Sequence, residues 1–192
     1  MNVVRRAAAV LADPATAWPR IEKENGDAIY LLISYVALFA LIPAAAGLIG
    51  GSVIGVVLPG TGTVRMPLGE GLLAAIFAYA AAFVQVLLVA LLIDMLAPWF
   101  GASRSFAAAL KLAVYCFTPV WLAGIFLLLP GLRFLGFTGL YSAVILGSGL
   151  PALMRAPQQR SLSYAAVIVV LAAALLFVTA AVQRSLFGAA AS

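Results

Sequence analysis

The sequence predicts an all-α integral membrane protein, a bundle of five transmembrane helices with a short amphipathic N-terminal segment. Of its 192 residues, 66% are hydrophobic and only 9% are charged, whereas soluble domains carry about 25% charged residues. A soluble core of this size cannot bury so much apolar side chain. Five stretches are also long enough to cross a bilayer, whose core of about 30 Å requires about 20 apolar residues in a helix.

The predicted spans lie near residues 28–50, 71–97, 106–129, 134–154 and 164–183. They define a membrane domain over 28–186, followed by a short tail over 187–192. Pro130 and Gly131 predict a tight turn between the third and fourth spans. The first stretch starts late, follows acidic residues and is too long for the apolar region of a signal peptide, so we expect a permanent anchor.

Basic residues predict the orientation. If the N-terminus is cytoplasmic, eight basic residues lie on the cytoplasmic side and three on the other, in agreement with the positive-inside rule. Five crossings then place the C-terminus outside. The eight are Arg5, Arg6, Arg20, Lys23, Arg104, Lys111, Arg155 and Arg160; the three are Arg65, Arg133 and Arg184. A net charge of +5 is usual for such a protein and gives no reason to invoke nucleic acid.

Residues 1–27 are too few for a domain and are predicted to form a cytoplasmic amphipathic leader. Apolar residues around Arg5 and Arg6 favour a segment that lies on the inner membrane face, with a partly disordered leader as the alternative. Asp13 and Pro14 have the pattern of a helix N-cap followed by proline at the first helical position. Trp18 is of the type that anchors at the level of the lipid headgroups.

Two ionisable residues inside the spans are candidates for an intramembrane ion pair. Asp94 lies near the cytoplasmic end of the second span, and Lys111 lies less than two turns into the third. Because a short hairpin joins these spans, both side chains are expected at similar depth, where a pair would neutralise them. The pair would either fix the hairpin or take part in handling an ion, a proton or a ligand.

Three polar residues, Gln85, Tyr115 and Thr118, lie near the middle of their spans. Hydrogen bonding between helices is the favoured interpretation, and a polar path through the membrane is the alternative. On the fourth span, Gly139, Ala143 and Gly147 form a stripe of small residues. Such a stripe allows close helix packing, more often within one chain than between chains.

The residue inventory argues against an enzyme. The chain has no histidine and a single cysteine, Cys116, which excludes a serine–histidine nucleophile, a Cys/His zinc site and an internal disulfide. Asp94 is the only acidic residue within a span, so no intramembrane aspartyl dyad can form. No glycine-rich phosphate loop is present. We therefore expect no catalytic residue, no metal and no cofactor.

Four ordered stretches resemble the bacterial branch of the Yip family, integral membrane proteins named for interaction with Ypt/Rab GTPases. The stretches are Asp13-Pro14 to Glu24; Leu96 to Gly101; Lys111 to Tyr115 continuing to Thr118-Pro119 and Trp121 to Gly124; and Leu140 to Ser142 continuing to Gly149-Leu150-Pro151, Pro157 and Tyr164. The resemblance implies five membrane helices with a cytoplasmic N-terminus. The short leader and alanine-rich composition fit a bacterial inner (cytoplasmic) membrane protein, for which no Rab GTPase partner is expected.

The sequence thus favours a non-enzymatic Yip-type protein that acts through protein or lipid contacts at the cytoplasmic face. Membrane lipids, a second copy of the chain and other membrane proteins are the partners that this interpretation leaves open. The expected contact face comprises Trp18, Pro98, Phe100, Gly101 and Arg104. The alternative is a small transporter or channel for an ion, proton or small solute that uses Asp94 and Lys111.

Overall fold

The computed structural model describes residues 3–23, 28–58 and 62–187. Within them, five helical segments are long and apolar enough to cross a membrane, which confirms the all-α membrane bundle. These segments are Leu32–Ile54, Leu68–Phe100, Phe106–Leu128, Phe134–Met154 and Gln158–Phe187. The last begins before its predicted start because six mostly polar residues extend the helix beyond its apolar part. Of the predicted tail, residues 188–192 lie outside the described residues.

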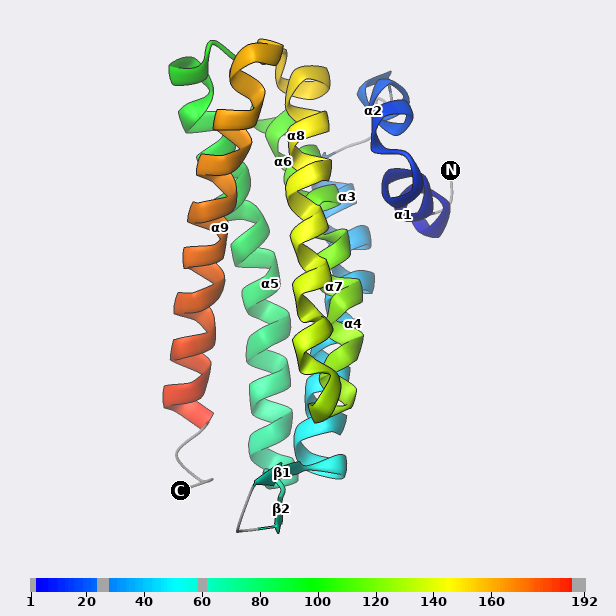
Figure 1. The fold of residues 1–192 in the computed structure, drawn as a ribbon, viewed down its shortest axis with the longest axis vertical. Coiled ribbons are helices and arrows are strands. Elements are labelled where there is room, and N and C mark those ends of the chain that lie inside the picture. Colours follow the sequence, from blue (N-terminus) through cyan, green and yellow to red (C-terminus); the bar gives the residue numbers. More distant parts are fainter. Residues whose placement is uncertain (1–2, 24–27, 59–61, 188–192) are drawn as a thin grey trace.

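The first span combines several helical segments. α3 (Ala28–Leu31) continues through a π-helical stretch, Leu32–Val36, into α4 (Ala37–Leu48) and a second π-helical stretch, Ile49–Ile54. A short antiparallel hairpin of β1 (Val56–Leu58) and β2 (Gly62–Val64) then leads to the second span. The hairpin lies at the end of the bundle where α9 also ends (Figure 1).

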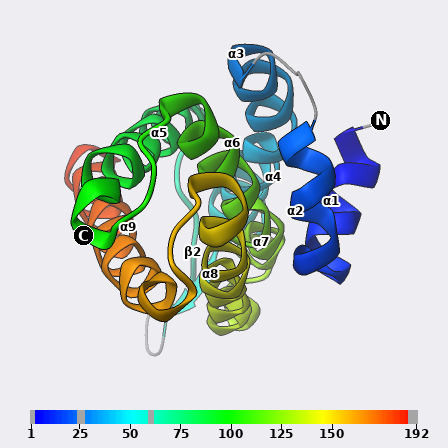
Figure 2. The same ribbon diagram turned by 90° about the horizontal axis from the view of Figure 1, so that it is seen from above.

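The second span, α5 (Leu68–Leu96), packs against three other spans: α4, α6 (Phe106–Cys116) and α9 (Gln158–Phe187). α8 (Tyr141–Met154) packs against α6 and α9, as the view along the bundle shows (Figure 2). We call the end that carries the α5–α6 and α8–α9 connections the basic end. These two connections and the start of α9 carry three arginines: Arg104, Arg155 and Arg160.

A proline divides the third span into α6 and α7 (Thr118–Ala123), which a 3-10 segment, Gly124–Leu128, extends. Pro119 has no N–H to donate to the carbonyl of Tyr115, four residues earlier. The Thr118 hydroxyl donates to that carbonyl instead, at 2.7 Å. The backbone therefore remains satisfied in the membrane without a polar ligand.

The fourth span starts as a 3-10 segment, Pro130–Leu140, and continues as α8. The small-residue stripe on this span packs within the chain. A Cβ atom on Gly139 would lie 3.4 Å from the Cα of Val120, and one on Gly147 would lie 3.9 Å from the Cβ of Ala165. The stripe thus contacts the third span at one point and α9 at another.

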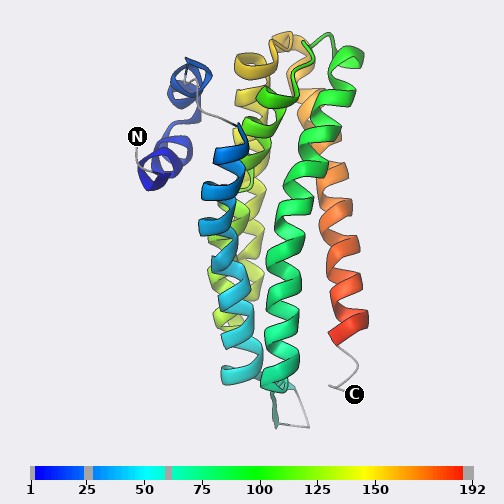
Figure 3. The same cartoon turned by 180° about the vertical axis from the view of Figure 1, so that it is seen from behind.

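The leader forms two helices, α1 (Val3–Ala12) and α2 (Pro14–Lys23), that lie beside the bundle near its basic end (Figure 3). Asp13 caps α2 as predicted, because its Oδ1 accepts the N–H of Thr16 at 3.3 Å. α2 packs on α8 and α1 on α7. The expectation of a leader lying on the lipid surface is corrected in this respect: its apolar side, which includes Ala7, Val10, Ala17 and Ile21, is buried against protein.

Candidate functional site

Trp18 holds the leader on the bundle. Its side chain is 0% exposed, and its indole N–H donates to the Ser148 hydroxyl at 3.0 Å. Gly149 makes room for the ring: a Cβ there would lie 2.8 Å from two atoms of the indole. The placement of Trp18 on an exposed contact face was therefore wrong, because α8 offers the indole both an apolar seat and a hydrogen-bond acceptor.

The aromatic contacts continue from Trp18 into the centre of the bundle. The rings of Trp18 and Tyr115 meet edge-on at a centroid distance of 6.1 Å, and Tyr115 meets Tyr35 in the same way at 5.1 Å. The Tyr35 and Thr118 hydroxyls are hydrogen-bonded at 2.8 Å. Since the Thr118 hydroxyl already donates to a backbone carbonyl, the Tyr35 hydroxyl is the donor in this second bond. Tyr115 and Thr118 thus belong to a packed core.

Gln85 lies apart from these two residues. It lines a separate apolar hollow between α5 and α9, with neighbours such as Phe77, Val84 and Val178. The structure therefore does not join Gln85, Tyr115 and Thr118 into the polar path that was the alternative interpretation. The reason is the direction in which each helix turns its polar side chains. Gln85 faces α9, whereas Tyr115 and Thr118 face the first span and the leader.

Asp94 is paired with Arg104, not with the expected Lys111. Oδ2 of Asp94 accepts Nη2 of Arg104 at 3.0 Å and Nε at 3.3 Å. Asp94 is 7% exposed, while the Arg104 side chain is 61% exposed. Arg104 is closer because it belongs to the connection itself, whereas Lys111 lies in the second turn of α6, where it is half-buried. The pair joins the last turn of α5 to the loop that follows it.

The connection between α5 and α6 begins with a 3-10 turn over Ala97–Phe100. Phe100 stacks on Tyr164 of α9 at a centroid distance of 4.6 Å, and the Tyr164 hydroxyl donates to the carbonyl of Ile93. Gly101 ends the turn with φ of 72°, a left-handed conformation that glycine adopts without strain. Pro98 is exposed, and Trp99 is 79% exposed. Of the expected contact residues, Phe100 is therefore half-buried, while Pro98, Gly101 and Arg104 reach the surface.

Three arginines from two parts of the sequence lie on or next to this connection. The Ser103 N–H donates to the carbonyl of Met154 at 2.8 Å, so Arg104 and Arg155 each follow directly on a residue of the same hydrogen bond. Nη1 of Arg160 lies 4.0 Å from the position that a Cβ on Gly101 would occupy. We call Arg104, Arg155 and Arg160 the arginine cluster. All three are exposed, and in the sequence Arg155 and Arg160 indicate only the orientation of the chain.

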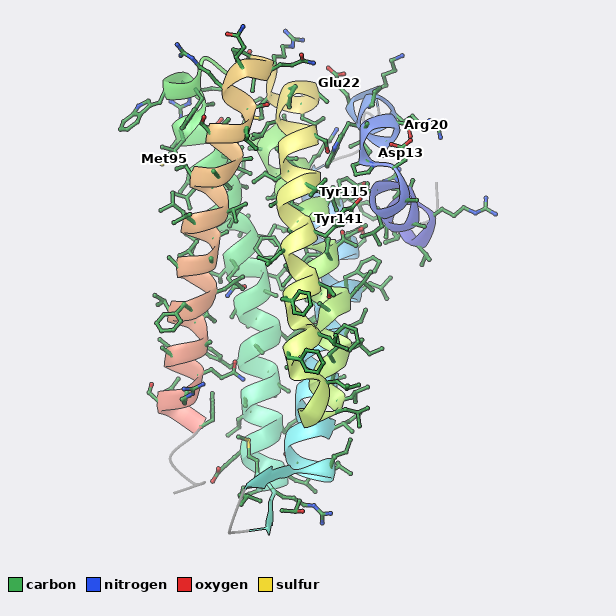
Figure 4. The ribbon with its side chains drawn as sticks, viewed as in Figure 1. Asp13, Arg20, Glu22, Met95, Tyr115 and Tyr141 are labelled. Carbon is green, nitrogen blue, oxygen red and sulfur yellow. The ribbon has the colours of Figure 1, made fainter. Side chains whose placement is uncertain are left out.

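Among the described residues, the acidic residues near the basic end other than Asp94 lie on the leader. Figure 4 shows Asp13 and Glu22 on the leader, on the opposite side of α8 from Met95 in the last turn of α5. Asp94 is the remaining acid of this end among the described residues, and Arg104 already binds it. Also within the described residues, no group of three or more His, Cys, Asp or Glu side chains could hold a metal ion.

An apolar groove of about 320 Å³ lies between α8 and α9, below the connection that carries Arg155. α8 and α9 run side by side from that connection (Figure 1). The lining includes Val120, Ala143, Leu146, Ile168 and Ala172, with Ser142 as a polar residue among them. The groove therefore adjoins apolar side chains along the middle of two membrane spans.

A family model described as the Yip1 domain matches residues 8–181. The matched region begins within α1 and ends near the end of α9, so it includes Trp18, the arginine cluster, four of the five membrane-spanning segments found within the described residues and most of the fifth. No curated protein sequence and no solved structure matches the chain. The family match and the five apolar helices agree, and the chain therefore belongs to the Yip family of multi-pass membrane proteins.

Proposed function

We propose that this protein is a non-enzymatic membrane module that acts through noncovalent contacts at the basic end of its bundle. The observation that supports the proposal most directly is the arginine cluster, in which Arg104 belongs to the same α5–α6 connection as the exposed Trp99. The Ser103–Met154 hydrogen bond and the Phe100–Tyr164 stack hold the two connections that carry these side chains. A fixed, basic surface with an exposed aromatic residue fits a site of binding.

The proposed orientation places the basic end in the cytoplasm and the C-terminus outside, in the inner membrane of a bacterium. Eight of the eleven basic residues belong to the sequence segments at the basic end, as the positive-inside rule requires. Cysteine substitutions at Trp99 and at Leu186 test this orientation. An impermeant thiol reagent added outside intact cells is expected to modify the cysteine at 186 and not the one at 99; the reverse pattern would refute the orientation.

A small transporter or channel is the second candidate, because Oδ1 of Asp94 is buried without a hydrogen-bond partner among the described residues. The contact module is favoured over it for two reasons. Arg104 already neutralises Asp94 near one end of a span, and Gln85 lies apart from the Tyr35–Thr118 pair. A continuous polar route between the two ends therefore has little support.

Photo-crosslinking from position 99 tests the contact module. A photoreactive probe is attached to Trp99→Cys in a Cys116→Ala background, and the matched control carries the probe at Leu186→Cys. Cross-linked species are expected from position 99 and are expected to fall in an Arg155→Gln/Arg160→Gln variant. Cross-linking that is absent, or that ignores the two arginines, would count against the module. Ion or proton flux in proteoliposomes that Asp94→Asn abolishes would establish the transporter in its place.

A further inference from the structure

We infer that the arginine cluster and the groove beneath it form one binding site for an anionic phospholipid. The phosphate of the headgroup lies at the cluster, and an acyl chain lies in the groove between α8 and α9. This inference rests on the proposed function and names the ligand class for the same basic end.

The cluster has unused capacity to bind a phosphate. Among the described residues, neither Arg155 nor Arg160 makes an ion pair. Arg104 uses Nε and Nη2 on Asp94, which leaves three of its five N–H donors. Planar guanidinium groups bind phosphate oxygens in pairs, and several arginines between membrane helices are a recognised basis for anionic headgroup binding.

The groove has the chemistry and size to take a hydrocarbon chain. Its lining is almost entirely apolar, and its volume is about 320 Å³; an apolar cavity of about 150 Å³ already takes up benzene. Phe137 and Leu140 in the lining are 61% and 68% exposed. These two residues lie in the 3-10 segment of the fourth span, so the groove is open to lipid at its end away from the arginine cluster.

The near edge of the groove lies within one lipid leaflet of the cluster. Arg160 and Ile168 lie in the same helix, eight residues apart, which corresponds to about 12 Å along the axis at 1.5 Å per residue. Half of a bilayer core of about 30 Å is about 15 Å. An acyl chain of a lipid whose phosphate lies at Arg160 can thus reach the near edge of the groove, and the lining continues deeper along α9 to Leu176.

The combination favours a phospholipid over a helix of another protein. Both parts of the site lie along the contact between α8 and α9. These two helices contribute to the lining of the groove, the α8–α9 connection carries Arg155, and the first turn of α9 carries Arg160. A transmembrane helix would fill the groove, but it would leave the arginines without an anionic partner. An acidic cytoplasmic protein would satisfy the arginines and leave the groove open. An anionic phospholipid carries both complements in one molecule.

Native mass spectrometry of the full-length chain tests the inference. The delipidated protein is titrated with phosphatidylglycerol and with phosphatidylcholine of the same acyl chains. Phosphatidylglycerol is expected to bind more tightly. Arg155→Gln/Arg160→Gln is expected to weaken it by about fivefold for each arginine lost and to leave phosphatidylcholine unchanged. Arg184→Gln, which removes one charge from the opposite end, is the control and is expected to have no effect.

A second pair of variants tests the groove. Ala172→Phe fills it, whereas Ala174→Phe places the same ring on an exposed position of α9 outside the lining. Ala172→Phe is expected to weaken both lipids by about tenfold or more, and Ala174→Phe to leave both unchanged. The thermal unfolding temperatures of the two variants are compared, and a variant that unfolds early is replaced by Ala172→Leu. Glycerol phosphate, the headgroup without chains, is expected not to displace the lipid.

Equal binding of the two lipids, insensitivity to the arginines or insensitivity to Ala172→Phe would overturn the inference. Displacement by glycerol phosphate at the same concentration as the lipid would also overturn it, since the site would then bind the anion alone. If position 99 still cross-links to a protein in an arginine-dependent way, the contact module stands and only its lipid ligand is lost. If that cross-linking fails as well, both proposals fall.

Discussion

Gly149→Ala is expected to loosen the leader, while Gly147→Ala, two residues earlier on the same helix, is expected to be tolerated. A Cβ on Gly149 would clash with Cδ1 of Leu112 and lie 2.8 Å from the indole of Trp18, whereas a Cβ on Gly147 would meet its nearest neighbour at 3.9 Å. Overpacking of a fully buried site costs about 1–3 kcal/mol. Replacement of a helical glycine by alanine without a clash is worth up to about 1 kcal/mol in the opposite direction. Because both glycines lie in α8, this gain cancels in the comparison, and the two variants should differ by about 1–3 kcal/mol.

Hydrogen exchange of α1 and α2, together with thermal unfolding in detergent, measures this difference. Gly149→Ala is expected to increase exchange in the leader, because the indole as well as the Leu112 side chain must shift before the methyl group fits. Gly147→Ala is expected to leave leader exchange unchanged. Equal leader exchange in both variants would refute the argument that Gly149 is required by the close approach of Trp18.

Three further substitutions test other contacts. Thr118→Val leaves a backbone carbonyl and the Tyr35 hydroxyl without their partner; we expect a loss of about 1–3 kcal/mol in unfolding free energy, and Tyr35→Phe, which keeps the carbonyl bonded, should cost less. A double-mutant cycle of Asp94→Asn and Arg104→Gln should give a coupling of at most about 1 kcal/mol that decreases with added salt, because Arg104 is largely exposed; strict additivity would argue against the pair. Gly101→Ala should lower the unfolding temperature because φ of 72° costs a non-glycine residue about 1–2 kcal/mol, and Gly101→Asn should be milder; equal effects would implicate sterics instead.

The five spans were predictable because a membrane helix is determined mainly by the length of an apolar run. All five predicted stretches overlap the helices of the structure, and the largest shift, at the start of α9, falls where polar residues leave the hydrocarbon region. The Asp13 cap was predictable for the same local reason: its partner lies three residues away. The hairpin of β1 and β2 was not foreseen, because its three-residue strands contain too little sequence pattern.

The contacts of Asp94 and Trp18 were not predictable, since they depend on how helices are rotated about their axes. Depth in the membrane suggested Lys111 as the partner of Asp94, but Arg104 of the intervening loop binds it. An amphipathic leader has the same pattern whether its apolar side meets lipid or protein. The burial of Trp18 depends on Ser148 and Gly149, which lie about 130 residues away in the sequence.

The contact between Trp18 and Ser148 also has a consequence for the order in which the protein matures. The leader leaves the ribosome before α8, yet its binding site on α8 exists only after the fourth span has been synthesised and inserted. The leader must therefore wait for residues synthesised well after it, and its docking marks a nearly complete bundle. A truncated nascent chain that stops before residue 148 would display the Trp18 indole to water or lipid, where quality-control proteases could reach it.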